Sequence, residues 1–176
     1  MFPSLIYTLG HSTRPVEELI ALLREHAVDL VVDVRRYPGS RRYPQYGRDV
    51  LAASLSAAGI AYRHEEDLGG RRRATPDSPN TYWRNAQFRG YADHLAMPAA
   101  LAAVDRLAAE APARRLALLC AEAVPWRCHR QLIADTLVSR GLEVLHIVAP
   151  GRAERHVVNP HARAEPDGRI VYPAPA

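Results

Sequence analysis

Five stretches of the chain have the apolar, often β-branched character of strands that are buried on both faces of a sheet. The clearest is RLALLC at 115–120, and LVVDV at 30–34 has the same uninterrupted pattern. The other three are LIYTL at 5–9, IAYRH at 60–64 and EVLHIV at 143–148. The pattern therefore predicts five core strands spread along most of the chain.

Helical periodicity fills the intervals between these strands. Apolar residues recur every three or four positions in the segments that we assign to helices, which are 15–26, 49–58, 98–111 and 126–140. Ser12 or Thr13 is the expected N-cap of the first helix. Gly59 and Gly141 are placed to end the second helix and the last one.

Strands that alternate with helices at this spacing predict an α/β fold, with a mostly parallel sheet of about five strands and helices on both faces. Such a three-layer architecture is Rossmann-like or flavodoxin-like. With 176 residues and a mass of 19.5 kDa, residues 1–176 are expected to form a single domain. Segment 151–176, rich in proline and arginine, is expected to pack on it as a C-terminal extension, with 169–173 as a candidate edge strand.

The basic residues are unusual because all 23 are arginines, and the formal net charge is +4 with a pI near 9.4. Genome base composition can produce this bias, but guanidinium groups also bind phosphates and carboxylates in a planar, two-pronged geometry. Nine of the arginines fall between Arg35 and Arg73. The charge therefore predicts an anionic partner, either a small molecule or a nucleic acid.

Other features limit the class of protein. No segment approaches the roughly 20 apolar residues of a membrane span, so no membrane partner is expected. The first residues lack the pattern of a signal peptide, which favours a cytoplasmic location. Cys120 and Cys128, the two cysteines, lie only eight positions apart, which favours catalytic, metal-binding or buried thiols over a disulfide framework. The sequence identifies neither a cofactor nor an oligomeric state.

Reactive side chains follow three of the predicted strands where each strand ends. His11 and Ser12 follow the first strand. Asp33, Arg35 and Arg36 come at the end of the second strand, and Cys120 and Glu122 come at the end of the fourth. Ligands of open α/β sheets bind at the carboxyl ends of the strands, near the point where the strand order reverses. We therefore predict an arginine-rich anion pocket at this edge.

Longer motifs include the same positions. They are GHS at 10–12, DVRRYPGSRRYPQY at 33–46, AAGIAYRHEEDLGGRR at 57–72, FRGYADHL at 88–95, LLCAEAVPWRCHRQLIADTL at 118–137 and HIV at 146–148. Together they resemble the DUF488 family of bacterial and archaeal proteins, from Tyr7 to the DGRIVYP segment at 167–173. The resemblance implies a single α/β domain but no reaction, because the function of the family is unknown. Tyr46 stands where a phenylalanine would be expected.

The first chemistry that fits the predicted pocket uses Glu122. A carboxylate beside Asp33 and His11 is suited to act as a general base or nucleophile, as in enzymes that cleave N-glycosidic bonds of nucleosides. Arg35 and Arg36 would bind a phosphate, and Tyr37, Tyr43 or Tyr46 would stack on the base. This interpretation predicts a hydrolase or transferase that acts on a nucleotide or a nucleic-acid-derived substrate.

The residues expected in the site fall into two groups. The candidate catalytic residues are Glu122, Asp33, His11 and Cys120. The candidate substrate-binding residues are Ser12, Arg35, Arg36, Ser40, Arg41, Tyr46, Arg71, Arg127 and Arg130. No residue is assigned as a metal ligand.

A second chemistry uses Cys120 as the nucleophile, as in cysteine phosphatases and rhodanese-like transferases. A cysteine between a strand and a helix N-terminus is placed to form a stabilised thiolate and to bind phosphate. The spacing departs from the phosphatase loop, since six residues separate Cys120 from Arg127 instead of five. Pro125 also removes one of the amides that such a loop uses.

A third chemistry uses zinc. Cys120, Glu122, Cys128 and His129 resemble elements of the zinc deaminases. In those enzymes the elements lie on separate segments, whereas here they fall within ten residues. Consecutive residues on a helix also point about 100° apart, which disfavours Cys128 and His129 as ligands of one ion.

A non-catalytic function also fits the sequence. The segment RRYPGSRRYPQYGR at 35–48 interleaves arginine with tyrosine, a pattern typical of contacts with single-stranded nucleic acid. The polar residues at the sheet edge would then be structural. Cys120 would be a buried plug, Cys128 a core residue of the following helix, and Asp33 and Arg35 a salt bridge.

Overall fold

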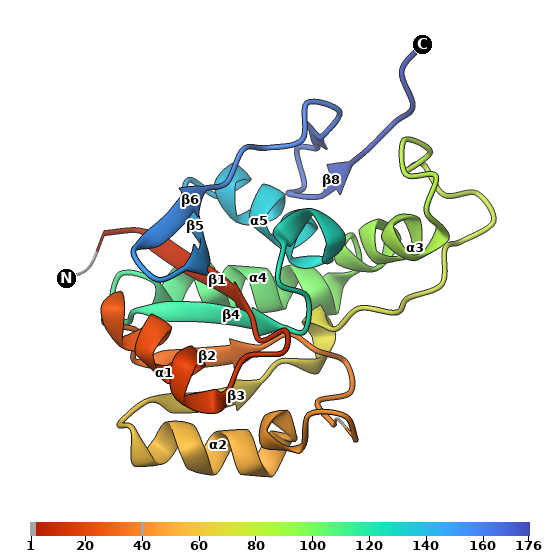
Figure 1. Cartoon of the computed structure of the whole chain (residues 1–176). Coiled ribbons are helices and arrows are strands. Elements are labelled where there is room, and N and C mark those ends of the chain that lie inside the picture. The colour runs from red at the N-terminus through yellow and green to blue at the C-terminus, as the bar shows by residue number, and fades with distance from the viewer. Residues whose placement is uncertain (1–2, 40) are drawn as a thin grey trace.

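The α/β fold predicted from the sequence is confirmed by a computed structural model, which describes residues 3–39 and 41–176. The main sheet has the order β3-β2-β4-β1-β5-β6, in which β1 to β5 are parallel and β6 is antiparallel (Figure 1). The parallel strands are those predicted, namely β1 (Leu5–Gly10), β2 (Leu30–Asp33), β3 (Ala61–His64), β4 (Leu116–Cys120) and β5 (Glu143–Ala149). The sixth strand, β6 (Arg152–Arg155), escapes prediction because its sequence, RAER, has no buried residue.

Helices cover both faces of this sheet. They are α1 (Val16–Glu25) and α2 (Arg48–Ala57) on one face, and α3 (Ala86–Leu95), α4 (Pro98–Glu110) and α5 (Arg130–Ser139) on the other (Figure 1). Alternate residues of β2 belong to the two cores. Val31 lies in the core with Leu19 of α1, and Val32 lies in the core with Leu107 of α4. Burial of both faces explains the uninterrupted apolar runs of β2 and β4.

The segment after β4 departs from the predicted helix at 126–140. A 3-10 turn, η3 (Pro125–Arg127), comes first, and α5 begins only at Arg130. Cys128 lies between them with extended backbone, φ −127° and ψ 145°. The N-terminal limit at Trp126 is therefore wrong, because the chain makes a separate turn before the helix begins.

The start of α1 also differs from expectation. Pro15, not Ser12 or Thr13, is its N-cap, and no side chain caps the helix. Ser12 instead has a left-handed φ of 48°. The turn at Ser12 and Thr13 therefore leads from the sheet edge to Pro15, the N-cap residue, whose φ is fixed by its ring.

Helix α3 was not predicted, because polar residues and Gly90 interrupt its apolar pattern. Gly90 is required by packing, since a Cβ there would lie 2.1 Å from the carbonyl oxygen of Arg72. Asn85 caps the helix by accepting hydrogen bonds from the backbone amides of Gln87 and Phe88. This helix brings the preceding loop against the sheet.

The segment that follows β6 packs on α5. Tyr172 is buried, and its hydroxyl donates to Oδ2 of Asp135 at 2.7 Å. The predicted edge strand at 169–173 does not join the main sheet; β8 (Ile170–Val171) pairs with β7 (Arg163–Ala164) in a separate two-stranded ribbon. Within residues 3–39 and 41–176, no helix is both long and apolar enough to cross a membrane.

Candidate functional site

The adjacent ends of β1 and β4 mark the point where the sheet topology reverses. The connection after β1 runs through α1 on one face, whereas the connection after β4 runs through α5 on the other. The amides of His11 and Ser12 donate to the carbonyls of Cys120 and Ala121, both at 2.9 Å, which prolongs the pairing beyond the strands. Parallel α/β sheets bind ligands at such a point.

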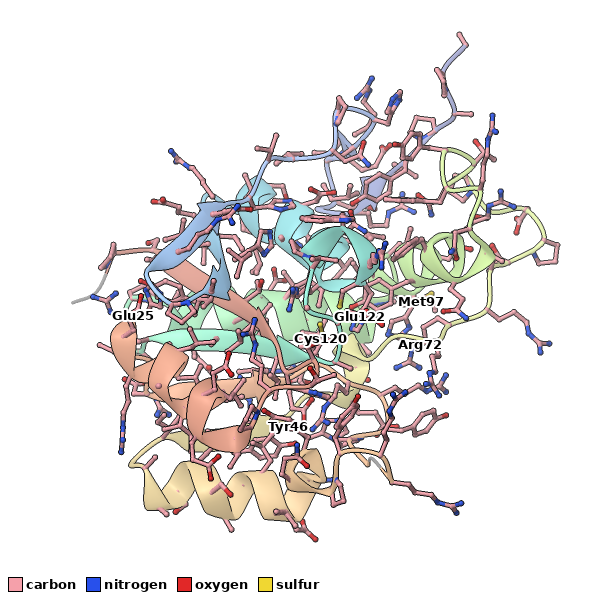
Figure 2. The ribbon with its side chains drawn as sticks, in the orientation of Figure 1. Glu25, Tyr46, Arg72, Met97, Cys120 and Glu122 are labelled. Carbon is pink, nitrogen blue, oxygen red and sulfur yellow. The ribbon has the colours of Figure 1, made fainter. Side chains whose placement is uncertain are left out.

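Glycine is required at the end of β1. A Cβ on Gly10 would lie 1.6 Å from the carbonyl oxygen of Glu122, far inside van der Waals contact. Figure 2 shows Cys120 and Glu122 close together at this edge of the sheet. The close approach of the two backbones brings the turn after β4 directly over the end of β1.

A pocket of about 810 Å³ opens at this edge. Its charged lining consists of one carboxylate, on Glu122, and five guanidinium groups, on Arg35, Arg36, Arg42, Arg71 and Arg127. Such an excess of positive charge in a concave site attracts anions. Ser12 and Arg71, which both line it, are two of three non-glycine residues in the described chain with left-handed φ. Strained backbone of this kind is concentrated at functional sites.

Asp33 lies behind the pocket, and its carboxylate is occupied by hydrogen bonds within the protein. The Asp33 carboxylate is 0% exposed and accepts hydrogen bonds from Nε and Nη2 of Arg35, at 2.9 and 2.6 Å, and from the hydroxyl of Tyr62. Burial lowers the pKa of Arg35, but the Asp33 carboxylate raises it by more. The carboxylate therefore fixes Arg35, whose Nη1 also donates to the carbonyl of Tyr46 at 2.8 Å.

His11 is held as a neutral ring at the pocket wall. Its Nδ1 donates to the carbonyl oxygen of Ser12 at 2.9 Å, so Nε2 carries the lone pair and lies 3.5 Å from Nη1 of Arg35. Burial lowers the pKa of His11, and the positive charge of Arg35 acts in the same direction. Tyr46 stacks on His11 with ring centroids 4.2 Å apart, and its hydroxyl donates to the carbonyl of Arg14. Tyr46 thus supports His11 from behind.

The two cysteines meet beside the pocket. Cys128 Sγ donates to Cys120 Sγ at 2.7 Å, and Nη1 of Arg130 lies 3.3 Å from Cys120 Sγ. Arg130 is 0% exposed, and its Nη2 donates to the carbonyl of Ala123 at 3.0 Å. Burial raises the pKa of the Cys120 thiol, but the hydrogen bond from Cys128 and the charge of Arg130 outweigh it, so the pKa is lowered. A thiolate on Cys120 is therefore favoured.

His129 is a second neutral imidazole, and it adjoins Cys128. Its Nε2 lies 2.9 Å from the carbonyl oxygen of Val34 and must donate to it, which leaves the lone pair on Nδ1. Nδ1 lies 3.7 Å from Cys128 Sγ. Burial lowers the pKa of His129 to about 4, and Arg130 contributes in the same direction. His129 is therefore neutral, and the lone pair of its Nδ1 lies beside Cys128.

The structure divides the predicted site residues by position. Those that line the pocket are His11, Ser12, Arg35, Arg36, Arg71, Cys120, Glu122 and Arg127. Those that do not are Asp33, Arg41, Tyr46 and Arg130, of which Asp33, Tyr46 and Arg130 are buried behind the lining. Ser40 lies outside the described residues.

Several lining residues were not assigned this role from the sequence. Asn85, Gln87 and Phe88 belong to the start of α3, a helix that the apolar pattern does not reveal. Trp126 also lines the pocket and is 61% exposed. The sequence signal for this position was a tryptophan in a strand-to-helix turn, because such a turn offers no core in which the ring could be buried.

The described part of the chain holds no group of three or more His, Cys, Asp or Glu residues arranged to bind a metal ion. Cys120, Cys128 and His129 do come together, but their polar atoms are bonded to one another, to Arg130 and to Val34. Glu122 is not bonded to them through its carboxylate. The zinc deaminase arrangement therefore finds no support in this geometry.

Comparison with known proteins gives one match. The family model described as "Domain of unknown function DUF488" matches residues 15–137, which include β2 to β4 and most of the pocket. No curated protein and no solved structure matches.

Proposed function

The chain belongs to the DUF488 family of unknown function, and we propose from its pocket that it is an enzyme in which the Cys120 thiolate attacks an anionic, nucleotide-type substrate. One observation carries the proposal. The end of β4 brings a thiol with lowered pKa, paired with the buried Arg130, to a pocket lined by five arginines. A positive partner activates nucleophilic cysteines in this way, and Cys120, which is only 1% exposed, is reached from the pocket that it lines.

The lining arginines have the role of binding the anion. Arg71 and Arg127 have side chains without an ion pair or hydrogen bond to any described residue, so their donors are available to a ligand. Guanidinium groups that meet phosphate in a low-dielectric pocket bind it through paired, charge-assisted hydrogen bonds. Arg35, by contrast, is committed to Asp33, whose carboxylate offsets its charge.

Two exposed aromatic rings support a base-bearing substrate. Tyr37 follows β2 and Trp126 follows β4, and both line the pocket. Aromatic rings beside cationic groups stack on nucleobases at about 1–3 kcal/mol per base. The substrate class that matches both features is a nucleotide or a nucleic-acid fragment.

Two titratable side chains that line the pocket are candidates for proton transfer. Glu122 is exposed there, and its carboxylate has no ion-pair partner among the described residues. His11 offers a neutral ring whose Nε2 carries a lone pair. Either group is suited to accept or return a proton at the substrate. Asp33 has the different role of positioning Arg35.

The test is alkylation of Cys120 by iodoacetamide with and without an anion. Trypsin cuts after Arg127 and so separates the two cysteines into different peptides. We expect Cys120 to react at least about tenfold faster than Cys128 below the usual thiol pKa, and pyrophosphate or AMP to protect it. Slow labelling, or labelling unaffected by either anion, would contradict the proposal.

A pair of arginine variants makes this test specific. Arg71→Gln should weaken protection by pyrophosphate at least about tenfold, as expected for one charge-assisted contact of roughly 1.5–3 kcal/mol, without changing the unprotected rate. Arg84→Gln is the control, because Arg84 is exposed and lies outside the pocket. Equal protection in the two variants would show that the anion binds elsewhere.

A second candidate function, a non-catalytic nucleic-acid-binding module, is favoured by one further observation. A groove of about 430 Å³ shares Arg36 and Arg71 with the pocket and adds Arg72 and Arg73. A continuous basic path suits a backbone with several phosphates. On this alternative, Arg73→Gln weakens binding of a single-stranded oligonucleotide and lowers its salt dependence, while Cys120→Ser changes neither.

A further inference from the structure

The contact between Cys120 and Cys128 places two thiols at one point of the pocket. Both cysteines are free, both line the pocket, and their sulfur atoms are 2.7 Å apart. The turn η3 and the extended backbone at Cys128 produce this contact, because a helix continuous from Trp126 would carry Cys128 onto a different path. Hydrolysis or phosphoryl transfer requires one nucleophilic thiol, so the second thiol needs a separate explanation.

The two thiols differ in charge. The pKa of Cys120 is lowered, for the reasons given above, whereas burial and the neighbouring Cys120 raise the pKa of Cys128 well above the ordinary value. The negative charge therefore resides on Cys120, and the proton on Cys128. Cys120 is the sulfur that attacks first, and Cys128 is the sulfur that holds a proton in reserve.

A base for the second thiol is also present. Nδ1 of His129 carries a lone pair and lies 3.7 Å from Cys128 Sγ, because Nε2 donates to the carbonyl of Val34. While Cys120 is a thiolate, it accepts the Cys128 proton in a hydrogen bond. Once Cys120 is bonded to a substrate atom it is no longer an anion, and His129 Nδ1 is then the neighbouring acceptor for that proton.

We propose that Cys128 is a second catalytic residue, a resolving thiol, and that the site reduces an anionic substrate that contains an electrophilic sulfur, such as a disulfide bearing carboxylates or phosphates. This inference rests on the proposed function, since it requires Cys120 to be the nucleophile. It assigns the reaction class of the pocket as thiol–disulfide exchange.

The reaction balances in two steps. The Cys120 thiolate attacks one sulfur of the substrate disulfide, a Cys120–substrate S–S bond forms, and the other half leaves as a thiolate. Cys128 Sγ then attacks Cys120 Sγ while its proton passes by way of His129 Nδ1 to the departing half, so that no buried imidazolium accumulates. The Cys120–Cys128 disulfide forms, and the second half leaves as a thiol. Two electrons pass to the substrate, and two equivalents of a small-molecule thiol, which leave as their own disulfide, return the protein to its dithiol form.

The arginine pocket explains why the substrate must be anionic. Five guanidinium groups and one carboxylate line the approach to Cys120, and the buried Asp33 offsets one of the five, so a positive charge remains. A substrate with carboxylate or phosphate groups would be held with its sulfur over Cys120, and the thiolate that leaves in the first step would be stabilised by the same positive charge. A neutral disulfide would lack both advantages.

The experiment uses dithiobis(nitrobenzoate), an aromatic disulfide with two carboxylates that releases a coloured thiolate. The chain has two cysteines, so the colour released and the mass of the protein together identify the pathway. We expect the wild-type protein to release two equivalents and to end two hydrogens lighter, with no adduct. Cys128→Ser should release one equivalent and retain one nitrobenzoate adduct on Cys120.

Further variants separate the two steps. Cys128→Ala repeats the test with a different side chain, and circular dichroism verifies that each variant is folded. His129→Gln should slow the second release at least tenfold near neutral pH and leave the first release unchanged. A merely structural role for His129 would alter both releases or neither.

The outcomes distinguish this inference from the proposed function. A wild-type protein that ends with nitrobenzoate on both cysteines would overturn the resolving role, while fast attack by Cys120 would leave the proposed nucleophile intact. A slow first release that Cys120→Ser does not change would overturn both. A stable single adduct on wild-type Cys120 would also exclude Cys128 as the resolving thiol.

Discussion

The role of Asp33 can be decided by Asp33→Asn, which keeps the shape of the side chain and removes its charge. The carboxylate is fully buried and accepts two hydrogen bonds from the guanidinium of Arg35, a residue that is itself only 8% exposed. The substitution leaves the Arg35 guanidinium without its counter-charge in the protein interior. Loss of one partner of a buried ion pair costs about 3–5 kcal/mol.

This cost is large compared with the stability of a domain, which is roughly 5–15 kcal/mol. With a urea dependence of about 2 kcal/mol per molar, a loss of about 4 kcal/mol lowers the unfolding midpoint by about 2 M. Chemical denaturation followed by circular dichroism measures this shift. Asp77→Asn is the matched control, because Asp77 is exposed and outside any ion pair of the described chain, and a change within about 0.5 kcal/mol is expected for it.

A double variant tests the reason for the loss. Asp33→Asn combined with Arg35→Met removes both charges, and we expect it to recover part of the stability lost in Asp33→Asn. A loss below about 1 kcal/mol in the single variant would refute this reasoning. It would mean that the Asp33 carboxylate is solvated and available for acid–base chemistry, as the sequence suggested.

Three other measurements follow from the structure. Burial lowers the pKa of His146 in the folded protein from 6.5 to about 3. The unfolded chain therefore binds the proton more readily than the folded protein does. The contribution of His146 to stability is complete above pH 6.5 and is lost as the pH falls towards 3. His146→Gln should flatten that decline in urea midpoints. Gly10→Ala forces the turn at Glu122 away and should slow alkylation of Cys120 at least tenfold; an unchanged rate would show that the turn moves freely. Trp126→Ala should weaken AMP protection about tenfold but not pyrophosphate protection, since only AMP has a base to stack.

Much of the fold could be predicted because the strands and most of the helices have recognisable local patterns of apolar residues. The apolar runs at β2 and β4 reveal strands buried on both faces, and the alternation with helices leads to a mostly parallel sheet. The same reasoning places His11, Arg35, Cys120 and Glu122 at one edge, and all four line the pocket. Position at a strand end is enough to bring these residues together.

The elements that prediction missed have weak local signals. Helix α3 has a glycine in its middle that is required by contact with a distant loop, and strand β6 is held by its hydrogen bonds to β5. For α3 the stabilising partner is remote in the sequence, so no window of neighbouring residues contains the information. Strand β6 pairs with β5 across the short turn at Pro150 and Gly151, and it was missed because RAER has no apolar pattern.

The sequence by itself determined the fold class and the set of reactive groups at the sheet edge, because periodicity and strand ends are local properties. Only the tertiary structure decided what each group can do. It buries Asp33 against Arg35, turns the chain at η3 so that Cys128 meets Cys120, and directs Nε2 of His129 to Val34. These contacts depend on the insertion of β4 between β1 and β2, a sheet order that follows from the packing of whole helices and is absent from any local pattern.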